Sequence, residues 1–184
     1  MPNTTKALNS YKFQDSLVVT QQGTQDVVDW IQHRRETIKL ENVENDKAYQ
    51  RHDIDFIWIT RKNVNLVEVK VDRYQTGNFF FETLSNQERN TPGCFLYTKA
   101  NLILYYFYPS KILYTLPMPA TKNWFLAHKK SFSVRATQTD IKKGTYTTVG
   151  CLVPIKRVLE EVPEVKHFSL IKKDANRSEP ESYC

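Results

Sequence analysis

The strongest constraint on this chain is a pair of apolar runs that contain charged residues, 53–59 (DIDFIWI) and 66–72 (LVEVKVD). Both runs are rich in β-branched and aromatic residues, and the polar segment between them is typical of a turn, so they predict a β-hairpin. A charged group that is buried in such a strand without a partner costs several kcal/mol. Asp55, Glu68 and Lys70 must therefore be paired, exposed at a strand end, or neutralised by a bound cation.

Side-chain alternation decides which of these groups can meet. Successive side chains point to opposite faces of a strand, so Glu68 and Lys70 share one face, and Asp53 and Asp55 share a face of the preceding strand. If the hairpin brings the acidic faces together, carboxylates and one ammonium converge on one ligand. Such oxygen ligands suit Mg²⁺, for which we expect Mn²⁺ to substitute, and water and substrate phosphate usually complete its shell. An adjacent lysine can orient the attacking water or stabilise charge on a phosphodiester.

At these positions the sequence resembles the PD-(D/E)XK nuclease superfamily, the restriction-endonuclease-like and Holliday-junction-resolvase-like phosphodiesterases. The family pattern is an Asp at the start of one strand, then a Glu or Asp, any residue and a Lys on the next. Here it corresponds to Asp55 and to Glu68, Val69 and Lys70, within a resemblance that spans residues 20–117. The resemblance implies that Asp55 and Glu68 bind Mg²⁺, that the backbone carbonyl of Val69 completes the shell, and that Lys70 helps to activate water.

Two positions depart from the family pattern. Ile54 precedes the catalytic Asp where a proline is usual. Many relatives also carry a metal-binding Glu near the start of the first helix, where this chain has Gln25, Asp26 and Asp29, and Gln25 aligns best. Asp53 and Gln25 are therefore the candidate accessory ligands. The alternative is that residues 25, 26 and 29 are solvated residues of a first helical turn, with the two acids favoured by the helix dipole.

Two other triplets, at 140–142 and 164–166, also consist of an acid, any residue and Lys. The first lies beside a Lys-Gly turn and the second follows a proline, and neither has an apolar run with an acid just upstream. We therefore predict that the Glu68 triplet alone carries the site. The alternative for that triplet is a cross-strand charge ladder on a solvated sheet face.

The polar segment after the second strand contains Arg73, Thr76 and Asn78. Loops that follow a catalytic strand often contact substrate, so these residues are candidates for phosphate or sugar contacts. An ordinary structural turn around Gly77 is an equal alternative.

The remaining patterns predict alternating helices and strands. The expected elements are a helix opened by Gly23 with Thr24 as its N-cap, strands at 37–43 and 145–153, a hairpin of 102–108 with 112–116, and helices at 94–100, after Thr121 and at 155–161. This order predicts the α/β class. The resemblance implies a three-layer sandwich in which helices flank a mixed central sheet, as in restriction endonucleases. We expect one domain over residues 1–171 and a polar tail over 172–184.

Charge and cysteine content limit the partners. The net charge of +6 and the pI near 9.1 favour an anionic partner, most commonly nucleic acid. Cys94, Cys151 and Cys184 are too few and too dispersed for a disulfide framework or a zinc site, which favours a reducing, cytoplasmic setting. The first ten residues lack the apolar core of a signal peptide, and no apolar run is long enough for a membrane span, so we expect no membrane partner.

Two functions of different classes follow from these observations. The first is a Mg²⁺-dependent DNA endonuclease that hydrolyses phosphodiester bonds, which the complete Asp55, Glu68 and Lys70 set favours. The second is a catalytically silent nucleic-acid-binding or interaction domain on the same scaffold. The sequence leaves open whether the substrate is DNA or RNA and whether the chain acts as a homodimer.

Overall fold

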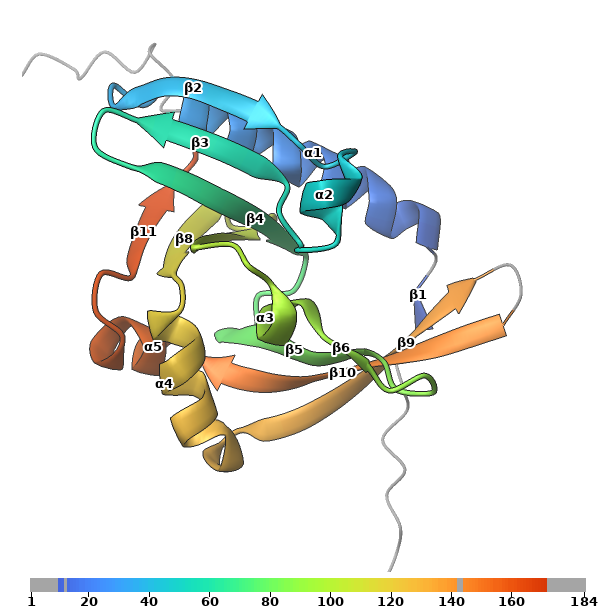
Figure 1. Ribbon diagram of the computed structural model, residues 1–184. Coiled ribbons are helices and arrows are strands. Elements are labelled where there is room, and N and C mark those ends of the chain that lie inside the picture. The colour runs from blue at the N-terminus through green and yellow to red at the C-terminus, as the bar shows by residue number, and fades with distance from the viewer. Residues whose placement is uncertain (1–9, 12, 142–143, 172–184) are drawn as a thin grey trace, which may run out of the picture.

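The computed structural model describes residues 10–11, 13–141 and 144–171, and within them the strands form two sheets (Figure 1). The larger sheet contains β2 (Thr37–Asn42), β3 (Phe56–Thr60), β4 (Val64–Asp72), β7 (Leu102–Phe107), β8 (Ile112–Pro117) and β11 (Lys166–Ser169). The smaller sheet contains β1 (Ser10–Tyr11), β5 (Asn78–Asn86), β6 (Thr91–Pro92), β9 (Ser133–Ile141) and β10 (Gly144–Pro154). The helices are α1 (Phe13–Gln32), α2 (Lys47–Gln50), α3 (Cys94–Tyr97), α4 (Ala120–His128) and α5 (Ile155–Glu161), with a 3₁₀ turn at Lys129–Ser131.

The larger sheet is mixed, with the strand order β11-β8-β7-β4-β3-β2. Strands β2, β3 and β4 form an antiparallel meander, and β7 then lies parallel to β4. Strands β8 and β11 extend the sheet beyond β7 by antiparallel pairing. The two hairpins expected from the sequence are both present, and the mixed sheet with helices confirms the α/β class.

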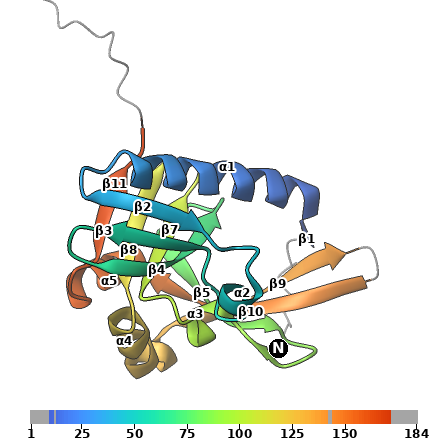
Figure 2. The same ribbon diagram turned by 45° about the horizontal axis from the view of Figure 1, so that its top comes forward.

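Helix α1 covers one face of the larger sheet (Figure 2). Its buried Val27 and Ile31 pack against residues that include Val67 of β4. The expected start of this helix at Thr24 is wrong, because α1 begins at Phe13 and Gly23 lies inside it. A Cβ atom at Gly23 would lie 2.5 Å from the Val71 side chain, so this glycine allows α1 to approach β4 closely instead of opening the helix.

The opposite face of the larger sheet is covered mainly by the smaller sheet. Phe79 and Phe81 of β5 pack in one cluster with Tyr105 and Phe107 of β7, and the rings of Phe79 and Tyr105 meet edge to face at 4.9 Å. Helices α4 and α5 join this cluster through residues such as Phe125. The layers are therefore helix, sheet and sheet, so the expected helical layer on this face is replaced largely by β5 and β10.

Strands β9 and β11 are not predicted by the sequence patterns. Strand β9 pairs with β10 over its whole length although much of it is polar, and β11 follows Glu164, whose φ of 64° turns the chain sharply. Helix α4 begins beside the expected cap, but the hydroxyl of Thr121 donates to the carbonyl of Pro117 (2.7 Å) and so does not cap the helix.

The expected tail at 172–184 and Lys142 lie outside the described residues. Among the helices of the described ranges, none is both long and apolar enough to cross a membrane.

Candidate metal centre

The register of the β3–β4 hairpin brings two predicted carboxylates together. Phe56 is opposite Val67, so Asp55, one residue earlier, stands beside Glu68, one residue later. The backbone N–H of Val69 donates to Asp55 Oδ2 (2.8 Å), so the Asp55 carboxylate lies against β4, next to Glu68. The register agrees with the expected pairing of these two acids, while their convergence on one metal and their catalytic roles remain predictions.

Glu68 is buried on the face that the smaller sheet covers. The residue is 8% exposed, and its Oε2 atom is buried with no hydrogen-bond partner among the described residues. Burial, together with the charges of Asp55 and Asp53, raises the pKa of Glu68 well above its usual value. The alternative of a charge ladder on a solvated sheet face is therefore wrong for Glu68.

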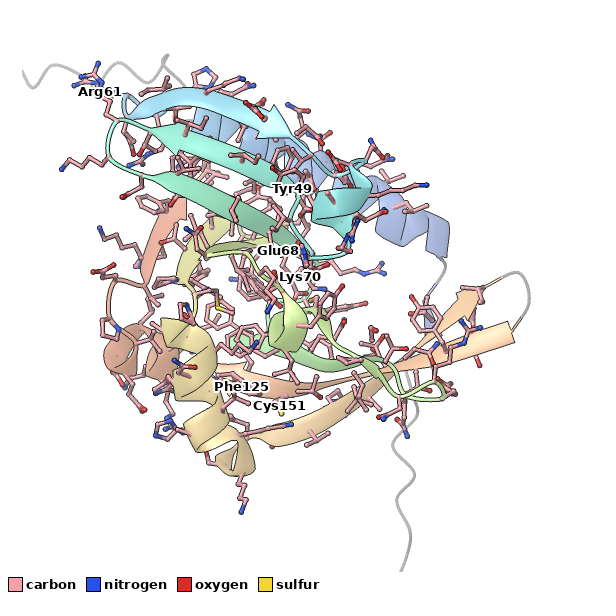
Figure 3. All side chains as sticks on the ribbon, in the orientation of Figure 1. Tyr49, Arg61, Glu68, Lys70, Phe125 and Cys151 are labelled. Carbon is pink, nitrogen blue, oxygen red and sulfur yellow. The ribbon has the colours of Figure 1, made fainter. Side chains whose placement is uncertain are left out.

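Lys70 extends from the same face of β4 toward α3 (Figure 3), where Glu82 and Cys94 lie among aromatic side chains such as those of Phe81 and Phe95. Its Nζ atom lies 3.6 Å from Cys94 Sγ and 3.7 Å from Glu82 Oε2. The Glu82 carboxylate, 3.7 Å from Nζ, favours the ammonium form and raises the pKa of Lys70 above its usual value. Lys70 is therefore an ammonium at neutral pH, even though its side chain is only about one-third exposed (34%).

Asp53 reaches the site from the turn before β3, not from an extended strand. Its φ of 57° places the backbone in the left-handed region, which Asp tolerates better than most residues. The Thr98 hydroxyl donates to the Asp53 carbonyl (2.9 Å), and the Tyr97 hydroxyl donates to Oδ1 (3.3 Å). Oδ2 is buried with no hydrogen-bond partner in the described part of the chain, and burial raises the pKa of Asp53. The expected strand alternation at Asp53 is wrong, but the turn still directs the carboxylate to the cluster.

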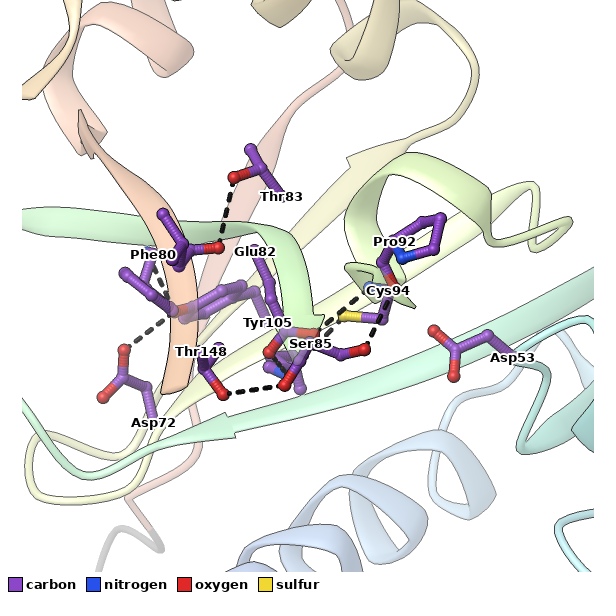
Figure 4. Close-up of polar contacts among 12 residues, drawn as sticks. Asp53, Asp72, Phe80, Glu82, Thr83, Ser85, Pro92, Cys94, Tyr105 and Thr148 are labelled. Carbon is purple, nitrogen blue, oxygen red and sulfur yellow. Dashed lines mark hydrogen bonds and ion pairs between the residues drawn. The ribbon is translucent and has the colours of Figure 1, made fainter. Parts of the chain in front are cut away.

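Glu82 of β5 and Cys94 of α3 also belong to this cluster and were not predicted. The Cys94 N–H donates to Glu82 Oε1 (3.3 Å), and Asp53 lies across from the thiol (Figure 4). One ligand atom each from Asp53, Glu68 and Cys94 lies within 4.8 Å of the others. Burial raises the pKa of Cys94 to about 12, so the group is a thiol at neutral pH. A single acid in the aromatic run 79–82 was the available sequence signal for Glu82.

Gln25 is not part of the cluster, which corrects its expected role as an accessory ligand. It lies on α1, which covers the other face of the larger sheet, and its Nε2 donates to Asp29 Oδ1 (2.7 Å). The Val69 side chain also faces the α1 side, as alternation predicts. Participation of the Val69 carbonyl in metal binding stays a prediction.

Arg73, Thr76 and Asn78 lie where β4 leads into β5. The Asn78 side chain donates to the carbonyl of Thr76 (3.0 Å), and Gly77 has a φ of 76°, so the segment forms a tight turn. The Arg73 guanidinium lies 5.6 Å from the ring centre of Tyr74. These contacts describe a structured turn, and substrate contacts from it remain a prediction.

A small cavity of about 10 Å³ lies beside Glu68, and its wall is mostly apolar, formed by aromatic side chains together with Lys70, Glu82 and Cys94. Its volume is about that of one water molecule. The Tyr105 hydroxyl closes it on one side by donating to Asp72 Oδ2 (2.7 Å) and accepting from the N–H of Phe80 (3.1 Å) (Figure 4). A larger cavity of about 910 Å³ between α1 and the end of β11 contains none of the clustered acids.

The cluster fits a divalent cation. Two carboxylate oxygens, Glu68 Oε2 and Asp53 Oδ2, are buried without hydrogen-bond partners in the described structure, and the pKa values of Asp53, Asp55 and Glu68 are all raised by burial. A cation would satisfy the oxygens and compensate their charge.

Comparisons with protein-family models, with curated proteins and with solved structures give no match to this chain.

Proposed function

We propose that this chain is a Mg²⁺-dependent endonuclease that hydrolyses phosphodiester bonds in DNA. The observation that carries the proposal is the convergence of Asp55 and Glu68 from adjacent strands, with Lys70 two residues farther along the same face. The residues are those that the family resemblance assigns to metal binding and catalysis.

Asp55 and Glu68 would hold the cation through their carboxylates. The register places the two residues opposite each other, and Glu68 Oε2 is buried with no hydrogen-bond partner in the described structure, which supports its role as a ligand. When bound, Mg²⁺ supplies Lewis-acid polarisation of the phosphodiester and lowers the pKa of coordinated water. Asp55 is held in place by the N–H of Val69, so the carboxylate is oriented before substrate arrives.

Lys70 acts as an electrostatic group in this proposal. Because its pKa is raised, Lys70 holds its proton at neutral pH and is a poor general base. Its ammonium instead stabilises the negative charge that develops on the phosphate oxygens and leaving group. Glu82, 3.7 Å away, positions the ammonium.

Basic residues at the rim beside Asp53 support an anionic substrate. Arg51, His52 and Lys99 are all exposed, and the Lys99 N–H donates to the His52 carbonyl (2.9 Å), so they lie on neighbouring segments. The net charge of +6 also favours nucleic acid. We assign these side chains to contacts with DNA phosphates.

The test is a cleavage assay with supercoiled plasmid, branched DNA and single strands, in Mg²⁺ and in Mn²⁺. Asp55→Asn and Glu68→Gln should abolish cleavage while DNA binding is retained, because binding rests on basic residues elsewhere. Lys70→Met should lower the rate by about 10²–10³-fold, the usual loss for one preorganised charge-stabilising group. A wild-type chain that binds DNA but cuts none of these substrates would overturn the proposal in favour of the silent binding domain.

The two other acid-x-Lys triplets supply matched controls. Asp140 lies on β9 of the smaller sheet, and Glu164 precedes β11, three strands away from β4. Both are exposed. Asp140→Asn and Glu164→Gln should therefore leave cleavage within about twofold of wild type, since exposed substitutions away from a site have small effects. Loss of cleavage in either folded variant would show that another triplet carries the chemistry.

A further inference from the structure

We propose that Asp53, Glu68 and Cys94 form a binding site for a thiophilic divalent cation of the Zn²⁺ class. The three residues come from the turn before β3, from β4 and from α3, so only the folded chain assembles them. The proposed Mg²⁺ site shares Glu68 with this set but uses Asp55 and no sulfur ligand.

The spacing of the three ligand atoms is close to that of a metal shell. They lie within 4.8 Å of one another, whereas ligands of a tetrahedral Zn²⁺ with bonds of ~2.0–2.3 Å lie roughly 3.5 Å apart. Side-chain movements of about 1 Å would close the shell. The neighbouring cavity of about 10 Å³ leaves room for one further ligand such as water.

The buried acids point to a ligand independently of the thiol. Glu68 is 8% exposed, and its Oε2 has no hydrogen-bond partner within the described ranges. Asp53 Oδ2 is also buried and unpartnered there, while Oδ1 accepts from Tyr97 (3.3 Å). Buried carboxylate oxygens without donors are costly, and a cation is the group that would satisfy both.

The sulfur atom selects the metal. Cys94 is a thiol in the metal-free chain, so binding of the cation would release its proton to solvent and leave a thiolate ligand. Thiolate ligands favour Zn²⁺ and similar ions, whereas Mg²⁺ takes oxygen ligands almost exclusively. Lys70 lies 3.6 Å from Cys94 Sγ and 3.7 Å from Glu82, so its ammonium can remain paired with Glu82 when the cation replaces it at the sulfur. Because Zn²⁺ and Mg²⁺ would share Glu68, Zn²⁺ would inhibit cleavage; this consequence alone rests on the proposed nuclease function.

The test measures cation binding directly, so it does not depend on cleavage. The full chain is titrated with Zn²⁺ by calorimetry in excess Mg²⁺, and with Co²⁺ while the near-ultraviolet thiolate-to-metal absorption is recorded. Wild type should bind one Zn²⁺ and show the Co²⁺–thiolate band. Cys94→Ser should lose the band and more than about 100-fold in Zn²⁺ affinity, since removal of even an outer-shell partner costs about 10–100-fold.

Controls separate this site from other thiols and from loss of fold. Cys151→Ala removes a thiol that is buried on β10, and Cys184→Ser removes the C-terminal thiol. Both should keep the band, and Asp53→Asn should weaken Zn²⁺ binding while circular dichroism confirms the fold. A Cys94→Ser variant that binds Zn²⁺ as wild type does, or a wild type without the Co²⁺–thiolate band, would overturn the inference.

Discussion

A buried carboxyl group at position 68 couples the site to the stability of the chain. The folded protein holds Glu68 with a pKa well above its usual value of 4.5, because burial and the nearby Asp55 and Asp53 disfavour the charged form. An acid whose pKa is raised by folding binds its proton more tightly in the folded state. The free energy of unfolding therefore falls as pH rises from the unfolded value through the folded value.

Replacement of Glu68 by Gln should stabilise the metal-free chain at neutral pH. The substitution removes the cost of ionising Glu68, so unfolding in urea at pH 7.5 with a chelator should require on the order of 1 kcal/mol more than for wild type. The difference should shrink toward pH 5, where wild-type Glu68 keeps its proton. Exposed Glu164→Gln is the control and should not change the pH dependence. A Glu68→Gln variant that is less stable than wild type at pH 7.5 would contradict the assignment of an ionisation penalty.

At the scale of elements, two glycines set how closely helices approach strands. Gly93, just before α3, would place a Cβ atom 2.5 Å from the carbonyl carbon and oxygen of Glu82 on β5. Gly23 of α1 would place one 2.5 Å from the Val71 side chain on β4. The first contact is with backbone, which cannot turn away, whereas the second is with a side chain that can adjust. Cys94 can therefore lie beside Glu82 because residue 93 is a glycine, which has no Cβ atom to clash with the Glu82 backbone.

Gly93→Ala should destabilise the chain more than Gly23→Ala does. We expect Gly93→Ala to lower the free energy of unfolding by about 1–3 kcal/mol, the usual cost of overpacking. In Gly23→Ala the gain of ~1 kcal/mol from helix propensity offsets part of the clash. Denaturant unfolding of both variants measures the difference. Equal stability of Gly93→Ala and wild type would show that α3 is not held against β5 as described.

At the scale of the whole molecule, exposed basic residues lie at both ends of the β3–β4 hairpin, including Arg61 beside Lys62 at the turn end. Arg51, His52 and Lys99 are exposed near Asp53, at the end of β3 where the acids converge. Lys62 is exposed at the other end, in the turn after Thr60, roughly 17 Å away for a five-residue strand. If DNA reaches the acids from the Asp53 side, only the first group can contact its phosphates.

Arg51→Ala and Lys99→Ala should each weaken DNA binding and reduce the slope of log affinity against log salt by about 1, because each removes one phosphate contact. Lys62→Ala should leave both quantities near wild type. Fluorescence anisotropy titrations with one duplex at two salt concentrations measure both. Equal losses in all three variants would place the DNA surface elsewhere or show that binding is diffuse.

Local pattern was sufficient for the elements whose residues alternate clearly. The apolar runs of β3 and β4 and the hairpin of β7 and β8 are predicted from sequence because the side-chain period and the intervening turn are local properties. The same period correctly assigns Glu68 and Lys70 to one face, and the short polar turn between the strands brings Asp55 beside Glu68. The sequence alone therefore determined the central pair of acids.

Tertiary structure decided what surrounds that pair. Strand β9 is largely polar and is held by pairing with β10, so its sequence lacks the alternation of a half-buried strand. Gln25 is removed from the site because α1 covers the other face of the sheet, and Glu82 and Cys94 join it from a segment that crosses between the parallel strands β4 and β7. Sequence spacing does not specify which face a crossover covers, since that choice depends on how the aromatic side chains of β5 pack against β7.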